Sequence, residues 1–232
     1  MTAPAVTCLF LDIGGVLLTD GWDRHARRRA AKAFGLAWTE FEPRHRLMFD
    51  TYEEGKLTLA DYLERVVFYE KRAFTRARFR RFMFAQSRPH ARMIDLIARL
   101  RVRYALKVIA VSNEARELNA HRIHAFELGR IIDAFVSSCF VHVRKPDADM
   151  YRIALDIAQV AARNVLYIEN TPMFVQIART MGIRSILHTD YQSTHGELVS
   201  LGLLDGAGDA PRPRSRPGAG VMGRDLGAML GR

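Results

Sequence analysis

Cysteine and long apolar runs are both scarce in this chain. The 232 residues include only two cysteines, Cys8 and Cys139, which provide neither a disulfide framework nor the spacing of a zinc site. No segment approaches the ~20 consecutive apolar residues of a membrane helix. The apolar beginning, residues 1–18, lacks a basic leader and is interrupted by Asp12 and two glycines, which argues against a signal peptide. We therefore expect a cytoplasmic protein that does not associate with membranes.

Acidic residues are also in the minority, with 25 Asp and Glu against 35 Lys and Arg, a formal charge of +10. Such an excess raises the question of an anionic partner. The basic run 76–81 alternates with phenylalanines, as in an amphipathic helix that buries its aromatic side. Nucleic acid is therefore not the partner we favour. A homodimer is left open.

Apolar residues make up 49% of the chain, enough for a sizeable core. Residues 6–11 predict a strand buried on both faces, and a Gly-Gly turn follows it. From Trp22 to Ala85 the apolar spacing changes to a helical one. Gly35, Pro43 and Gly55 fall near the breaks between the predicted helices, which cover 24–34, 39–52, 59–69 and 76–84.

Strands and helices alternate after Pro89, which opens a further helix. We expect strands at 106–111, 134–137, 164–168 and 184–187, with helices at 114–126, 147–157 and 172–181. This order predicts the α/β class: a Rossmann-like parallel sheet with helices on both faces and an inserted all-helical cap. The expected domains are a core of 1–19 and 89–201, a cap of 20–88, and a flexible tail of 202–232 rich in Gly, Pro and Arg.

Polar residues end several of the predicted strands. In an open parallel sheet the carboxyl ends of the strands meet at one edge, where ligands bind. A nucleophile, donors, a cation and an acidic group gathered there would suit phosphoryl transfer. The residues concerned are Asp12, Ser112, Asn113, Glu169 and Asn170, with Lys145 at a helix start.

Four segments, taken in order, resemble the motifs of the haloacid dehalogenase superfamily. They are 10–17 (FLDIGGVL), 108–113 (VIAVSN), 144–151 (RKPDADMY) and 165–172 (VLYIENTP), the last continuing to Met181-Gly182-Ile183. The resemblance runs from residue 6 to about 188, with the insertion placed as in the helical-cap branch. The motif pattern is most similar to that of glucose-1-phosphatase-like members.

The resemblance implies a phosphatase for a small phosphorylated substrate, in which Asp12 attacks phosphorus and forms an aspartyl-phosphate. Ser112 and backbone N–H groups near Gly14 and Asn113 would then hold the phosphoryl oxygens. Lys145 would neutralise Asp12 and the phosphate together. The implied cofactor is Mg²⁺, held by Asp12, the carbonyl of Gly14, and the acidic fourth motif at Glu169 and Asn170.

This sequence departs from the family pattern in the first motif and in the fourth. Gly14 stands where most family phosphatases have a second Asp, which serves as general acid and base. Glu169-Asn170 replaces the usual Asp pair, and Phe174 replaces a polar residue. The departure at Gly14 removes a proton donor, and the departure at Asn170 removes one negative charge from the metal site.

Other interpretations stay open at this point. Asp12, Lys145, Glu169 and Asn170 could be ordinary turn or loop residues, and Ser112 with Asn113 could cap the following helix. His121 and His124 have a metal-compatible spacing but no third ligand. The alternative functions are a metal-free 2-haloacid dehalogenase, which also lacks the second Asp, and a catalytically weak binding module.

Overall fold

The central element is a parallel β-sheet. The computed structural model describes residues 6–205, and within them the strand order is β3-β2-β1-β4-β5, with every neighbouring pair parallel. This arrangement is the predicted Rossmann-like α/β sheet, and β1 lies at its centre. The strands are β1 (Cys8–Leu11), β2 (Lys107–Ser112), β3 (Ala134–Ser137), β4 (Val165–Glu169) and β5 (Arg184–Leu187).

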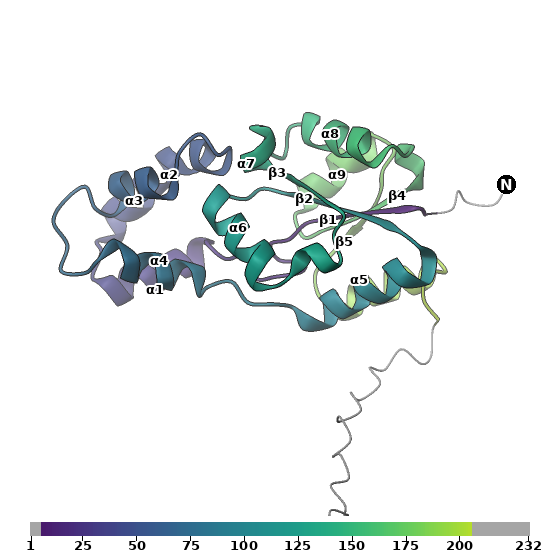
Figure 1. Cartoon of the computed structure of the whole chain (residues 1–232), viewed down its shortest axis with the longest axis horizontal. Helices are drawn as coiled ribbons and strands as arrows, with labels where there is room; N and C mark the ends of the chain where they lie inside the picture. The colour runs from purple at the N-terminus through teal and green to yellow at the C-terminus, as the bar shows by residue number, and fades with distance from the viewer. Residues whose placement is uncertain (1–5, 206–232) are drawn as a thin grey trace, which may run out of the picture.

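Helices cover both faces of the sheet, as predicted. Side chains alternate along a strand, so Leu9 and Leu11 enter one hydrophobic cluster while Cys8 and Phe10 enter another. The first cluster is closed by α5 (Ala91–Tyr104) and α10 (Tyr191–Ser200). The second is closed by α8 (Asp149–Ala158) and α9 (Pro172–Thr180), and α5 lies opposite α8 and α9 in Figure 1.

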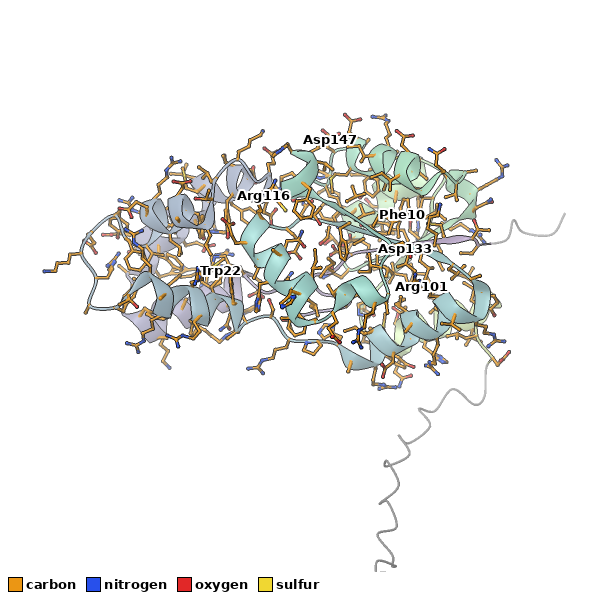
Figure 2. All side chains as sticks on the ribbon, viewed as in Figure 1. Phe10, Trp22, Arg101, Arg116, Asp133 and Asp147 are labelled. Carbon is orange, nitrogen blue, oxygen red and sulfur yellow. The ribbon has the colours of Figure 1, made fainter. Side chains whose placement is uncertain are left out.

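The inserted segment forms a helical layer at one end of the sheet (Figure 1). It comprises α1 (Arg24–Phe34), α2 (Trp38–Glu53), α3 (Leu59–Val66) and α4 (Arg76–Phe84). These helices enclose their own core around Trp22 and Phe79, whose rings meet edge to face at 5.8 Å; Figure 2 labels Trp22 among the helices. In α4 the arginines are exposed while Phe79 and Met83 are buried, as an amphipathic helix requires.

Two chain segments join this layer to the sheet, and they run side by side. Leu18 pairs with Pro89 in an antiparallel bridge, and the Thr19 N–H donates to the Arg88 carbonyl at 2.9 Å. Between the layer and the sheet lies α6 (Arg116–Ala125), which contributes Leu118 to the core of the inserted helices. No described helix has the length and apolar character needed to cross a membrane.

Three details differ from the sequence predictions. Pro43 lies inside α2 rather than at a break, and the helix continues to Glu53. Helix α10 was not predicted, because its sequence YQSTHGELVS has little apolar periodicity, although Asp190 caps it by accepting from the Ser193 N–H at 2.8 Å. The predicted tail begins too early: Leu203 and Leu204 are buried in the core, and residues 206–232 lie outside the described structure.

Candidate active site

Asp12 directly follows the central strand, at the edge where the carboxyl ends of the strands meet. Its backbone N–H continues the sheet by donating to the Ile168 carbonyl at 3.0 Å. The residue is only 8% exposed, and this remaining exposure opens onto a cavity. Asp12 is therefore a carboxyl group held rigidly by the sheet and reachable from one side.

Lys145 is buried against Asp12. Its Nζ lies 3.1 Å from Asp12 Oδ1, 2.6 Å from Glu169 Oε2 and 3.1 Å from the Tyr167 hydroxyl, and the residue is 1% exposed. Burial disfavours the ammonium, but Asp12 and Glu169 outweigh it and hold the pKa of Lys145 above its ordinary value. A permanent positive charge thus lies between two carboxylates.

Asn113 holds Lys145 through the backbone. Its side-chain oxygen accepts from the Lys145 N–H at 2.8 Å, and its amide donates to the Lys145 carbonyl at 2.9 Å. Neither Ser112 nor Asn113 caps the next helix, since α6 begins at Arg116 after Ala115 and has no side-chain cap. The capping interpretation of these two residues is therefore wrong.

Ser112 ends the neighbouring strand β2 and is almost fully buried beside Asp12. Burial and the charge of Glu169 raise the pKa of Asp12 to about 7, while Lys145 and the Ser112 hydroxyl act to lower it. The site thus favours neutralisation of Asp12 unless further positive charge is supplied.

The two glycines after Asp12 differ in what they permit. A Cβ on Gly14 would meet Asp20 Oδ1 at 3.6 Å, an ordinary contact. Gly15 has φ +73°, and a Cβ there would lie 1.9 Å from Asn170 Nδ2 and 2.8 Å from Asp20 Oδ1. Only Gly15 therefore combines a left-handed backbone with a close approach of side chains.

We expect Gly15→Ala to destabilise the protein clearly more than Gly14→Ala does. A left-handed backbone costs a residue with a Cβ about 1–2 kcal/mol, and moving Asn170 adds to this cost. Urea unfolding of both variants measures the difference in unfolding free energy. Equal losses would contradict the assigned roles of the two glycines.

The predicted metal ligands fall into two groups. Gly14 and Asn170 line the cavity with Asp12, whereas Glu169 does not. Glu169 is 0% exposed, and both of its oxygens are engaged: Oε1 accepts from the Thr171 N–H at 2.8 Å, and Oε2 accepts from Lys145 and the Tyr167 hydroxyl. In this arrangement Glu169 is a partner of Lys145 behind the site.

Among residues 6–205, no group of three or more His, Cys, Asp or Glu side chains is arranged to hold a metal ion. His121 and His124 therefore belong to no such group.

The cavity has a volume of about 400 Å³ and lies between the sheet edge and the inserted helices. This is large enough for a small metabolite. The sheet side contributes Asp12, Gly14, Ser112, Asn113, Lys145 and Asn170, and the helical side contributes Trp22, Asp23, Arg27, Phe49, Tyr52 and Glu53.

Sequence reasoning missed a buried ion pair at the cavity wall. Arg122 and Glu114 are both buried and form a direct ion pair. The Arg122 guanidinium also donates to the Thr19 carbonyl at 2.8 Å and to the Ser87 hydroxyl at 3.0 Å, one residue on each connecting segment. Glu114 precedes α6 and Arg122 lies inside it, so no helical spacing in the sequence indicates the pair.

Comparison with known proteins identifies relatives that cover most of the described chain. Residues 6–182 match the family described as haloacid dehalogenase-like hydrolase. A "phosphorylated carbohydrates phosphatase" of Thermotoga maritima is 26% identical over 203 residues, which cover 82% of this chain and 88% of that protein.

Solved structures share the fold. A haloacid dehalogenase family enzyme from Bacteroides thetaiotaomicron has a TM-score of 0.71 at 17% identity, covering 83% of this chain and 98% of that one. A structure of the same enzyme in complex with magnesium and inorganic phosphate has a TM-score of 0.69 at 16% identity, covering 82% and 99%. The L-2-haloacid dehalogenase of Xanthobacter autotrophicus has a TM-score of 0.57 at 16% identity, covering 86% and 84%.

Proposed function

The chain belongs to the haloacid dehalogenase-like hydrolase family, and we propose that it is a phosphatase acting on a small phosphorylated metabolite through Asp12. The observation that carries this proposal is the contact of Asp12 with the buried ammonium of Lys145 at the floor of a cavity of metabolite size. The Thermotoga relative, a phosphatase by name, supports the same reaction type.

The proposed reaction has two steps. An oxygen of Asp12 attacks phosphorus, the bond from phosphorus to the substrate oxygen breaks, and an aspartyl-phosphate forms. Water then attacks phosphorus, the bond from phosphorus to the Asp12 oxygen breaks, and inorganic phosphate leaves with the Asp12 carboxylate restored. In this proposal Lys145 and the Ser112 hydroxyl stabilise the charge on the transferred phosphoryl oxygens, because catalysis of this transfer is mainly positioning and charge neutralisation.

The donor set that faces the cavity fits Mg²⁺ with one carboxylate. Asp12, the Gly14 carbonyl and the Asn170 side chain supply hard oxygen atoms, and Mg²⁺ in proteins takes one or two carboxylates, with water and substrate phosphate completing its shell. Glu169 is not among these donors. We propose that the first three residues hold the ion, whose chemistry would be to neutralise phosphoryl oxygens.

We propose further that Asp20 replaces the acid missing at Gly14. A Cβ on Gly14 would lie 3.6 Å from Asp20 Oδ1, so the Asp20 carboxyl occupies the space that a side chain at residue 14 would enter. Asp20 lines the cavity, and partial desolvation together with the charge of Asp23 raises its pKa. It is therefore placed to protonate the departing oxygen.

We expect Asp20→Asn to slow alkyl phosphates by about 10²-fold, with little effect on p-nitrophenyl phosphate, whose leaving group departs without a proton. The measurement is the slope of log kcat/KM against leaving-group pKa for wild type and variant. Asp50→Asn is the control, because Asp50 is an exposed carboxylate that does not line the cavity. Equal slopes in all three proteins would show that Asp20 is not the general acid.

The function itself is tested with a panel of phosphorylated metabolites, the carbohydrate phosphates first because of the Thermotoga relative. Phosphate release with Mg²⁺ that stops with EDTA is the expected result. Release of halide from a 2-haloacid, unaffected by EDTA, would instead support the dehalogenase alternative. Neither activity in a folded protein would support the binding module.

A further inference from the structure

One part of the cavity is not used by the proposed chemistry. It lies where the end of α2 meets the segment that leads into Lys145. Arg144 Nη2 donates to Glu53 Oε2 at 2.7 Å, and its Nη1 pairs with Asp50. Arg144 and Glu53 line the cavity with Phe49, whereas Asp50 does not. The ion pair therefore contributes one acidic and one basic side chain to the cavity wall at the end of α2.

The end of α2 is fixed against the sheet domain, so these side chains are firmly placed. The Ser138 hydroxyl donates to the Glu53 carbonyl at 2.7 Å, and His142 Nδ1 lies 2.7 Å from the Glu54 carbonyl. Gly55, with φ +69°, packs so closely on Cys139 that a Cβ would lie 2.4 Å from its carbonyl. A rigid wall of this kind suits the recognition of a ligand.

Polar atoms without partners occur on the same wall. Among residues 6–205, the Tyr52 hydroxyl and Arg144 Nε are buried and have no hydrogen-bond partner. Tyr52 is 2% exposed and lines the cavity. Buried polar groups are normally satisfied, so these two residues present unused hydrogen-bonding capacity beside the cavity.

The charge state of Glu53 is also sensitive to its surroundings. Burial raises the pKa of Glu53 to about 7, against the lowering effect of Arg144. Additional hydrogen-bond donors stabilise the charged form of a buried carboxyl group, and hydroxyl groups of a ligand would supply them. An apolar ligand would displace water from Glu53 and Arg144 without replacing the hydrogen bonds that the water made.

We propose that Glu53, positioned by Arg144, determines specificity by accepting hydrogen bonds from hydroxyl groups of the substrate. The substrate class is then a phosphorylated polyhydroxy compound, with its phosphate at Asp12 and its hydroxyl groups at the α2 wall. Phe49 offers an apolar ring for the carbon skeleton. This inference rests on the proposed phosphatase function and goes beyond it by assigning the recognition of the remainder of the substrate.

The test compares Glu53→Gln with Asp50→Asn. Both residues pair with Arg144, but Glu53 faces the cavity at 14% side-chain exposure whereas Asp50 is 72% exposed. The probes are a set of hexose and pentose phosphates, with cyclohexylmethyl phosphate as the analogue that has no free hydroxyl and phenyl phosphate as a general substrate. The quantity measured is kcat/KM for the best sugar phosphate relative to cyclohexylmethyl phosphate.

We expect wild type to favour the sugar phosphate and Asp50→Asn to keep this preference. Glu53→Gln should lower the preference about 10-fold or more through KM, because a hydrogen bond to a charged group is lost. Arg144→Lys, which keeps the charge but loses the two-pronged geometry, should lower the preference in the same direction. Melting temperatures confirm that each variant is folded.

Three results would overturn the inference: no preference in wild type, an unchanged preference in folded Glu53→Gln, or an equal loss in Asp50→Asn, which would indicate an ion pair that only holds the helices in place. Hydrolysis of phenyl phosphate distinguishes failure of this inference from failure of the proposed phosphatase function. A protein that cleaves phenyl phosphate without preferring sugars contradicts the inference alone.

Discussion

Asp12→Asn is expected to lower phosphate release about 10³-fold or more while the protein remains folded. The amide has nearly the shape of the carboxyl but is a poor nucleophile, and loss of a nucleophile removes most of the catalysis in an enzyme of this kind. Stability should hold or rise slightly, because Lys145 keeps Glu169 at 2.6 Å as a partner and one of two neighbouring carboxylates is removed. Steady-state hydrolysis of phenyl phosphate and a thermal melt measure the two effects.

A variant at a second carboxylate serves as the comparison for this prediction. Asp50→Asn removes a charge of the same sign from an exposed position outside the cavity. It should leave the hydrolysis of phenyl phosphate within about twofold of wild type. If folded Asp12→Asn retains more than a few per cent of wild-type activity, Asp12 is not the nucleophile.

Lys145→Met is expected to destabilise the protein by about 3–5 kcal/mol near neutral pH and to abolish turnover. The substitution leaves Asp12 and Glu169 buried without their shared counter-charge, and removing one partner from a buried ion pair costs about this much. Urea unfolding gives the free energy of unfolding, and phosphate release gives the turnover.

The pH dependence of this loss has a defined sign. In wild type the pKa of Asp12 is already raised to about 7 by burial and Glu169. Without the lowering effect of Lys145 it rises further, so the folded variant binds a proton that the unfolded chain releases above pH ~4. The stability deficit should therefore be larger at pH 8 than at pH 5, and it should grow above pH ~7, where Asp12 ionises in wild type but not in the variant. Adding Glu169→Gln to the variant removes one uncompensated charge and should recover part of the loss.

A deficit below about 1 kcal/mol, equal at both pH values, would mean that Lys145 is not paired as described. Lys71→Met provides a control for the loss of a lysine side chain. Lys71 is exposed in the connection between α3 and α4 and does not line the cavity. Its replacement should change stability little.

The sheet and the residues at its edge could be predicted because strand and motif coincide in the sequence. Asp12 and Ser112 each stand at the end of an apolar run, and parallel pairing brings such ends together whatever the loops do. The ranges 24–34, 76–84, 134–137 and 184–187 agree with α1, α4, β3 and β5. Elements without apolar periodicity, such as α10, gave no comparable signal.

The arrangement of charges could not be predicted in the same way. A motif position does not say which way a carboxylate points: Asn170 lines the cavity, whereas the adjacent Glu169 turns to Lys145 and Tyr167. The pair Arg144–Glu53 depends on how the inserted helices rest on the sheet domain. That placement depends on tertiary contacts, which no local sequence pattern indicates.

The most direct test of the central claim is chemical trapping of the aspartyl-phosphate. Enzyme in excess is mixed with phenyl phosphate and Mg²⁺, quenched with acid and treated with borohydride, which reduces an acyl phosphate to an alcohol. Peptide mass spectrometry should then find homoserine in place of Asp12, dependent on substrate and absent from Asp12→Asn. Phosphate release with Asp12 unmodified, or with the label on another carboxylate such as Asp20, would contradict Asp12 as the nucleophile.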